Sequence, residues 1–308
     1  MLKFRKLFVF IGIPVFLAAI GFLMWSPLPS YTVENQVLHV QPTPARIAEG
    51  KRIALTICSR CHYNEELGAL TGRHHGNPER LGVFSSANIT RDTATGIGKW
   101  SDGQLFYFLR TGVNPSGKFV FDMPKYPNLS DEDVFSIISF LKSSDSLVRP
   151  VNHDIPRPSY SFPLRLLLFF WLRPVRFVIT VPQPDTTDLN GFGRYLATAK
   201  FACSDCHSGN AITYNYLHPE KSWGYFQGGN PHANERREKI YSLNLTPDVE
   251  SGIGKWTEEQ FLQAVKYGKK PDGTMLQDPM FPFALLTDKE VKAIFTYLNS
   301  LIPVSNSY

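Results

Sequence analysis

The four cysteines of this chain lie in two copies of one short motif, Cys-x-x-Cys-His. The copies are Cys58-Ser-Arg-Cys61-His62 and Cys203-Ser-Asp-Cys206-His207, and no cysteine occurs elsewhere. Two thiols three residues apart lie on one side of a helical turn, so both can bond to the two vinyl groups on one side of a porphyrin. The histidine that follows then presents its imidazole to the iron. A redox-active thiol pair and half of a zinc site are the alternatives for one motif, but two copies that use every cysteine predict two covalently bound haem c groups.

The N-terminus predicts export. Residues 7–25 are 19 uncharged residues, about enough helix to cross a hydrocarbon core roughly 30 Å thick. Lys3, Arg5 and Lys6 precede this run and predict that everything after it lies outside the cytoplasm. A cleavable signal peptide is the alternative, but this apolar run is longer than usual and lacks a small-x-small exit. We expect an uncleaved anchor in the cytoplasmic (inner) membrane, with the haem domains on its periplasmic face.

Composition excludes two classes of protein. The sequence is 43% hydrophobic and 13% aromatic, which excludes a globally disordered chain. The formal net charge is +5, of which three charges belong to the N-terminal basic residues, so the rest of the chain carries only +2. A nucleic-acid-binding protein normally shows a basic face. We therefore expect no nucleic-acid partner.

A second pattern repeats at an offset of 156 residues. Asn88-Ile-Thr-Arg-Asp92 and Thr95-Gly-Ile-Gly-Lys-Trp100 recur as Asn244-Leu-Thr-Pro-Asp248 and Ser251-Gly-Ile-Gly-Lys-Trp256. After each tryptophan a capping-box pattern predicts a helix that ends at a glycine, over 101–112 in the first copy and 257–268 in the second. Ser130 and Thr287 each open a further helix with apolar residues at i, i+3, i+4 and i+7. The chain is a duplicated helical unit.

The register of this repeat selects one methionine in each half as the second axial iron ligand. Met123 precedes Ser130 by seven residues, and Met280 precedes Thr287 by seven. A thioether favours ferrous iron, so His62 with Met123 and His207 with Met280 would give two coordinatively closed irons of raised potential. Met275 is out of register and is the weaker candidate in the second half. Filling a gap in a core is the alternative for any single methionine.

In this combination, the motifs resemble the membrane-bound cytochrome c subunits of bacterial alcohol, aldehyde and gluconate dehydrogenase complexes. The resemblance covers roughly residues 45–145 and 190–300. It implies a mainly α fold, with two tandem class I cytochrome c domains after an N-terminal transmembrane helix. Those subunits typically carry three haem domains and this sequence has two motifs, so the resemblance does not fix the partner.

The same resemblance implies roles for two further pairs of residues. Trp100 and Trp256 would lie near a haem propionate, with core packing as the alternative. Gly50 and Gly193 match the glycine at which the first helix of each domain crosses the last. Glycine suits this position because it has no side chain to hold two helices apart.

The expected domain organisation follows from these patterns. It is an N-terminal membrane anchor at 1–30, a cytochrome c domain at 31–149, a proline-rich apolar connector at 150–189 and a second cytochrome c domain at 190–308. Within the connector, the segment 164–173 holds only seven uncharged residues in a row, 166–172, which are too few to span a bilayer. With Arg165, Arg173 and Arg176 around it, this apolar segment suits a membrane surface, a partner protein or the seam between the two domains.

Electron transfer is the function that these patterns favour. We expect a non-enzymatic subunit of a respiratory chain that takes electrons from a dehydrogenase subunit or quinol donor and passes them to a downstream cytochrome or terminal oxidase. A di-haem redox enzyme, peroxidase-like or thiosulfate dehydrogenase-like, is the alternative, but it needs an open iron position or a spare cysteine ligand. An assembly subunit with structural haems is a third possibility. Arg60 and Asp205 distinguish the two motifs and predict that the first haem edge prefers acidic partners and the second basic ones.

Overall fold

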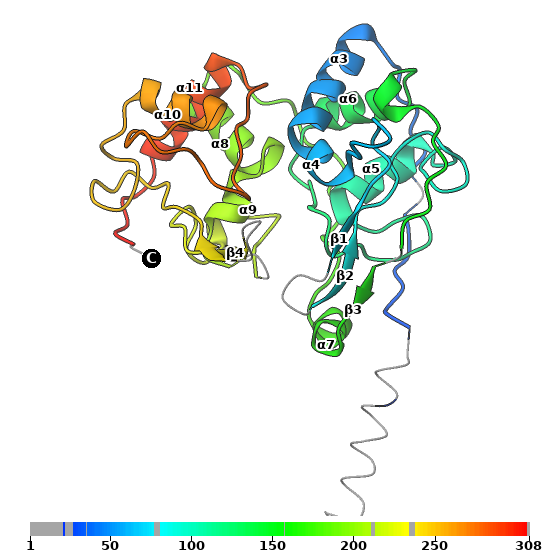
Figure 1. Ribbon diagram of the computed structural model, residues 1–308. Coiled ribbons are helices and arrows are strands. Elements are labelled where there is room, and N and C mark those ends of the chain that lie inside the picture. Colours follow the sequence, from blue (N-terminus) through cyan, green and yellow to red (C-terminus); the bar gives the residue numbers. More distant parts are fainter. Residues whose placement is uncertain are drawn as a thin grey trace, which may run out of the picture.

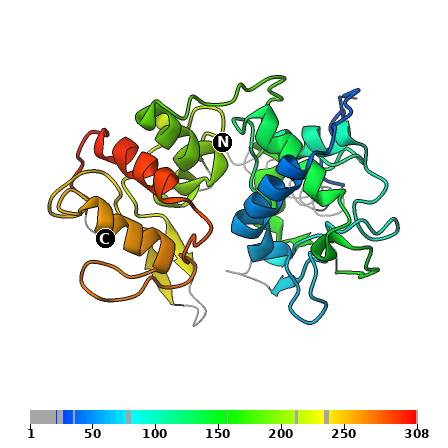
Figure 2. The ribbon, with the colours of Figure 1, turned by 90° about the horizontal axis from the view of Figure 1, so that it is seen from above.

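The computed structural model of this chain describes residues 21, 27–34, 36–76, 81–156, 158–210, 213–233 and 238–306. These residues form two mainly helical halves that lie side by side in both views (Figure 1 and Figure 2). The first half contains α3 (Pro44–Ile53), α4 (Ser59–His62), β1 (His74–Gly76), β2 (Gly82–Ser85), α5 (Asp102–Thr111) and α6 (Asp131–Leu141). The second contains α8 (Leu189–Tyr195), α9 (Cys203–His207), β4 (Pro231–Ala233), β5 (Lys239–Tyr241), α10 (Glu258–Tyr267) and α11 (Asp288–Asn299). Each half encloses a hydrophobic core of its own.

The repeated helices begin and end where the sequence predicts. Ser101 and Thr257 are the N-caps of α5 and α10, and both form complete capping boxes. The two helices end at Gly112 and Gly268, whose φ angles of 78° and 76° suit glycine. Ser130 and Thr287 likewise cap α6 and α11. These predictions are confirmed.

In each half, the first and last long helices cross at a glycine. A Cβ on Gly50 in α3 would lie 1.9 Å from the carbonyl oxygen of Ser136 in α6. A Cβ on Gly193 in α8 would lie 1.8 Å from the carbonyl oxygen of Ala293 in α11. No side chain fits into either space, which confirms the expectation for Gly50 and Gly193.

The connector belongs to the first half. Its strand β3 (Ser159–Tyr160) pairs with β2, and α7 (Phe162–Phe170) follows directly. Further along, Phe177 packs against Phe106 and Tyr107 in the first core, with ring centroids 6.0 and 5.0 Å away. The amide of Asp131 donates to the carbonyl of Val181. Residues 159–181 therefore wrap the first half before the chain enters the second.

The two halves meet through reciprocal contacts. In the first half, Arg52 lies two residues after the crossing glycine Gly50, and it donates two hydrogen bonds of 2.8 Å to the carboxylate of Glu290 in α11. At the matching position of the other half, Tyr195 donates to the carboxylate of Asp133 in α6. Glu290 and Asp133 are both the third residue of their helices. Equivalent positions of the two halves thus contact each other reciprocally, as in an isologous interface, here formed within one chain.

A buried lysine reinforces this contact. Lys200 lies 2.7 Å from Glu49 and 3.0 Å from Asp133 of the first half, with its side chain 8% exposed. A buried charge is costly unless it is paired. Lys200 with two carboxylates therefore ties the second half to one position on the first.

None of the helices in the described ranges is long and apolar enough to cross a membrane. The anchor expected at residues 7–25 lies outside the described residues, apart from Gly21.

Candidate haem-binding sites

Both Cys-x-x-Cys-His motifs lie at the end of an interrupted helix. In the first half, the π-helical turn Ala54–Cys58 ends at the first cysteine of the motif, and in the second half the π-helical turn Leu196–Lys200 lies shortly before the motif. The four cysteines all lie within the described residues and form no disulfide bond with one another. Burial raises the pKa of Cys58 to about 12 and that of Cys203 to about 11. A redox-active thiol pair needs a lowered thiol pKa, so these surroundings do not suit disulfide exchange.

The two motif histidines are buried and held by the same kind of hydrogen bond. His62 Nδ1 lies 2.7 Å from the carbonyl oxygen of Ala87, and His207 Nδ1 lies 2.8 Å from that of Leu243. A carbonyl only accepts, so Nδ1 is the donor and Nε2 keeps its lone pair for a metal. Burial lowers the pKa of each imidazole to about 4, which keeps both rings neutral. A neutral imidazole with a fixed tautomer is the form that binds iron.

The repeated Asn-x-Thr pattern holds these carbonyls in place. Asn88, the residue after Ala87, is 3% exposed, and its side chain makes four hydrogen bonds. They join Nδ2 to Thr95 Oγ1 (3.0 Å) and Val151 O (2.9 Å), and Oδ1 to the amide (3.0 Å) and hydroxyl (2.7 Å) of Thr90. Asn244, after Leu243, makes the equivalent four bonds to Ser251, Val304 and Thr246. The repeat is therefore a loop that orients the motif histidine.

The glycines of this repeat are required by close backbone approach. A Cβ on Gly96 would lie 2.5 Å from the carbonyl oxygen of Thr90, and one on Gly252 would lie 2.1 Å from that of Thr246. Ile97 and Ile253 beside them are buried in the two cores. The sequence identified this motif as a repeat, whereas its action on the histidine through Ala87 and Leu243 was missed. A backbone carbonyl acceptor cannot be recognised from the side chain of its residue. Only the position of Ala87 and Leu243 directly before the repeated asparagine could have indicated their role.

In the first half, Cys61 is exposed, whereas three other predicted site residues lie against one core. Cys58, Trp100 and Met123 are half-buried and pack against it together. The ring of Trp100 meets Phe108 edge-on, with centroids 5.3 Å apart. This contact shows core packing for Trp100, and its hydrogen bond to a haem propionate stays a prediction, as it does for Trp256.

In the second half, Cys203 and Trp256 pack against the second core. Met280 is half-buried in the loop between α10 and α11, and its amide donates to the carbonyl of Gln277. Met275 is 56% exposed. The greater burial of Met280 agrees with its choice over Met275, and iron ligation by Met123 and Met280 stays a prediction.

Arg60 and Asp205, the residues that distinguish the two motifs, both face the opposite half. The guanidinium of Arg60 stacks over Phe281, next to Met280, and lies 4.4 Å from the ring centroid of Phe283. Asp205 is half-buried. Desolvation raises the pKa of its carboxyl to about 6, and the charge of Lys125, two residues after Met123, opposes this rise.

This arrangement corrects the prediction that the two charges attract external partners. Arg60 contacts the loop that carries Met280, and Asp205 lines a small cavity together with Pro124 and Lys125 of the loop that carries Met123. The two candidate haem sites therefore share one seam, and Arg60 and Asp205 are part of it.

Comparison with known proteins agrees with this geometry. The family model described as Cytochrome c matches residues 47–145, which include the first motif, Trp100 and Met123. The first half contains a cytochrome c domain. Its two thiols and its buried histidine with a free Nε2 fit a covalently attached haem c.

The similarity extends over both halves. The chain is 28% identical over 278 residues to the fructose dehydrogenase cytochrome subunit of Gluconobacter japonicus, covering 85% of this chain and 54% of that protein. It is 28% identical over 233 residues to the gluconate 2-dehydrogenase cytochrome c subunit of Pantoea cypripedii, covering 72% and 52%. A diheme cytochrome c-type protein of Cereibacter sphaeroides is 27% identical over 256 residues, covering 78% and 80%. The chain thus spans about half the length of the dehydrogenase cytochrome subunits that it resembles.

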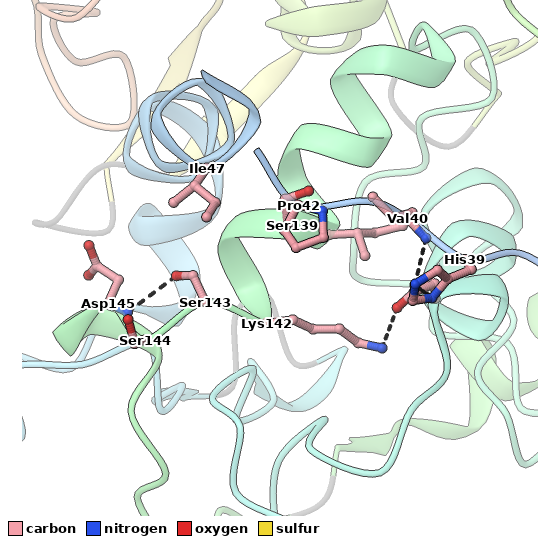
Figure 3. A pocket seen from close by; sticks show the side chains of 11 residues that line it. His39, Val40, Pro42, Ile47, Ser139, Lys142, Ser143, Ser144 and Asp145 are labelled. Carbon is pink, nitrogen blue, oxygen red and sulfur yellow. Dashed lines mark hydrogen bonds and ion pairs between the residues drawn. The ribbon is translucent and has the colours of Figure 1, made fainter. Parts of the chain in front are cut away.

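A cavity of about 590 Å³ in the first half is separate from the candidate haem-binding residues (Figure 3). Its polar groups bond to one another: Asp102 accepts from the amide of Val40 (2.8 Å) and from Lys142. Burial raises the pKa of the Asp102 carboxyl, but these two donors outweigh it and hold this pKa below its ordinary value. None of the motif or methionine residues lines this cavity, so it is not part of the candidate haem sites.

Proposed function

We propose that this chain is a membrane-attached di-haem c-type cytochrome that carries electrons and has no catalytic site of its own. The observation that carries the proposal is the duplicated support of the motif histidines, His62 by Ala87 and His207 by Leu243. The same support in the second half favours a second cytochrome c domain there, over residues 190–308. A haem c bound in each half supplies a one-electron couple.

In this proposal, the chain's own residues position and tune the two sites. The thiols tether each haem, and the fixed Nδ1–H of each histidine aims Nε2 at the iron. Met123 and Met280 would be the second iron ligands, and thioether ligation would favour the reduced iron. The reciprocal contacts at the seam hold the two motifs against each other, which supports direct electron exchange between the halves.

The partners in this proposal follow from the relatives. Two of them are named as cytochrome subunits of fructose dehydrogenase and gluconate 2-dehydrogenase. We assign the donor to a dehydrogenase subunit of this kind or to a quinol, and the acceptor to a downstream cytochrome or terminal oxidase. Residues 7–25 would hold the chain in the cytoplasmic membrane with both haems on the periplasmic side, as the basic residues before them indicate.

Haem counting with paired variants tests the proposal. We expect two haems per full-length chain, and one each in Cys58→Ser/Cys61→Ser and Cys203→Ser/Cys206→Ser. Far-UV circular dichroism of each variant checks that the chain still folds. A folded Cys203→Ser/Cys206→Ser variant with the wild-type haem content would show that the second half binds none, which contradicts the proposal.

A further inference from the structure

The helix α7 buries one side and leaves an aromatic end exposed. Leu164 and Leu168, one turn apart, are 3% and 4% exposed. At the end of the helix, Phe170 is 49% and Trp171 70% exposed, and their ring centroids lie 5.7 Å apart. The amide of Ser161, just before α7, donates to Leu81, whose side chain is 36% exposed. Large apolar side chains thus gather at one end of the molecule.

The segment around these side chains is basic. Between Asp154 and Asp185 the sequence holds four arginines and no acidic residue. Arg173 and Arg176 follow the aromatic end of α7, and both are exposed. Arg173 also donates to the carbonyl of Phe170, which closes the end of the helix. An apolar tip within a positive segment is complementary to an anionic lipid surface.

The path of the chain brings this surface to the membrane. Arg173 donates to the hydroxyl of Tyr31 at 3.3 Å, and the amide of Tyr31 donates to the carbonyl of Gly117 at 2.8 Å. Tyr31 is six residues after Trp25, the last residue of the expected anchor, so the intervening chain spans at most about 20 Å. Figure 1 shows α7 and the first described residues at the same end of the molecule.

We propose that the α7 tip, formed by Phe170, Trp171 and Arg173, lies in the headgroup region of an anionic membrane as a second membrane contact. The proposal rests on the membrane attachment proposed above. Tryptophan and arginine are the residues that favour this depth, the ring among acyl chains and the guanidinium among phosphates. The nine residues of α7 reach only about 14 Å, so the helix lies on the bilayer and does not cross it. This contact would fix the orientation of both halves above the membrane.

Photolabelling of the full-length, haem-loaded chain in vesicles tests this contact. The vesicles contain phosphatidylcholine and phosphatidylglycerol, and a bilayer-soluble carbene reagent labels residues that reach the acyl chains. Trp223 of the second half is 72% exposed and serves as the matched control for Trp171. We expect the peptide holding Phe170 and Trp171 to carry several-fold more label than the Trp223 peptide, and Trp171→Ser to reduce this difference while Trp223→Ser leaves it unchanged.

The outcomes separate this proposal from the one on which it rests. Label in residues 7–25 with none in the α7 peptide would overturn the second contact and keep the anchor. No label in either would overturn both. A photoreactive group at position 171 that crosslinks two copies of the chain, with the α7 peptide unlabelled by the lipid reagent, would make α7 a protein interface and refute the lipid contact.

Discussion

Replacing Asn88 by alanine is expected to destabilise the first half by about 4 kcal/mol. The side chain makes four hydrogen bonds in a site that is 3% exposed, and each bond of this kind contributes about 1 kcal/mol. The amide of Thr90 and the carbonyl of Val151 would also lose partners inside the protein, so the true cost is at least this large. The loop would then no longer hold the Ala87 carbonyl against His62.

Guanidinium unfolding of the haem-loaded chain, followed by haem absorbance, measures this effect. A loss of about 4 kcal/mol corresponds to a midpoint lower by about 1 M for the affected half. Asn244→Ala should act equally on the second half, because Asn244 makes the same four bonds. Asn299→Ala, at an exposed position in α11, is the control and should change little. Superimposable curves for Asn88→Ala and Asn299→Ala would refute the role assigned to the loop.

Three further predictions follow from the helix crossing and the seam. Gly50→Ala should cost about 3 kcal/mol by thermal unfolding, because its Cβ would meet Ser136 O at 1.9 Å; an unchanged melting temperature would contradict the close crossing. Arg60→Gln removes a positive charge beside both motifs and should lower the midpoint potential of the second site by tens of millivolts, since about 59 mV corresponds to a tenfold change in the equilibrium constant of a one-electron reduction. Identical redox titrations of the variant and the wild-type protein would exclude an influence of Arg60. Burial raises the pKa of the Glu49 carboxyl, but the hydrogen bonds and charges of Arg52 and Lys200 outweigh it and hold this pKa below its ordinary 4.5. The ionised Glu49 therefore stabilises the folded chain at neutral pH, and this stabilisation is lost as the pH falls through the lowered pKa. The protection factors of amides in α3 and in the π-helical turn Leu196–Lys200 should therefore fall as the pH is lowered below 4.5, and protection factors that do not change with pH would count against the ion pairs.

Features that depend on local chemistry were predictable from the sequence. Capping boxes at Ser101 and Thr257 and glycine ends at Gly112 and Gly268 fix helix boundaries through contacts within a few residues. The duplication itself was visible because it repeats these local signals at a constant offset. Matching register also led to Met123 and Met280, although the sequence alone does not test their ligation.

Features that depend on distant contacts were not predictable. The sequence singled out Arg60 and Asp205 correctly as the difference between the motifs, but nothing local shows that each faces the opposite half. The pairing of Arg52 with Glu290 joins residues 238 apart and depends on how the halves dock. The carbonyl of Ala87 was missed because every residue has one, and only the fold selects which carbonyl meets a histidine.

The most direct test of the account compares haem content with axial ligation in the purified ferric protein. Pyridine haemochrome gives the number of haems per chain, and the intensity of the methionine–iron charge-transfer band gives the number of His/Met sites. The account predicts two haems and a full band for each, through Met123 and Met280. A band equivalent to one haem or none would contradict ligation by Met123 and Met280, and an iron with an open position would favour the di-haem redox enzyme instead.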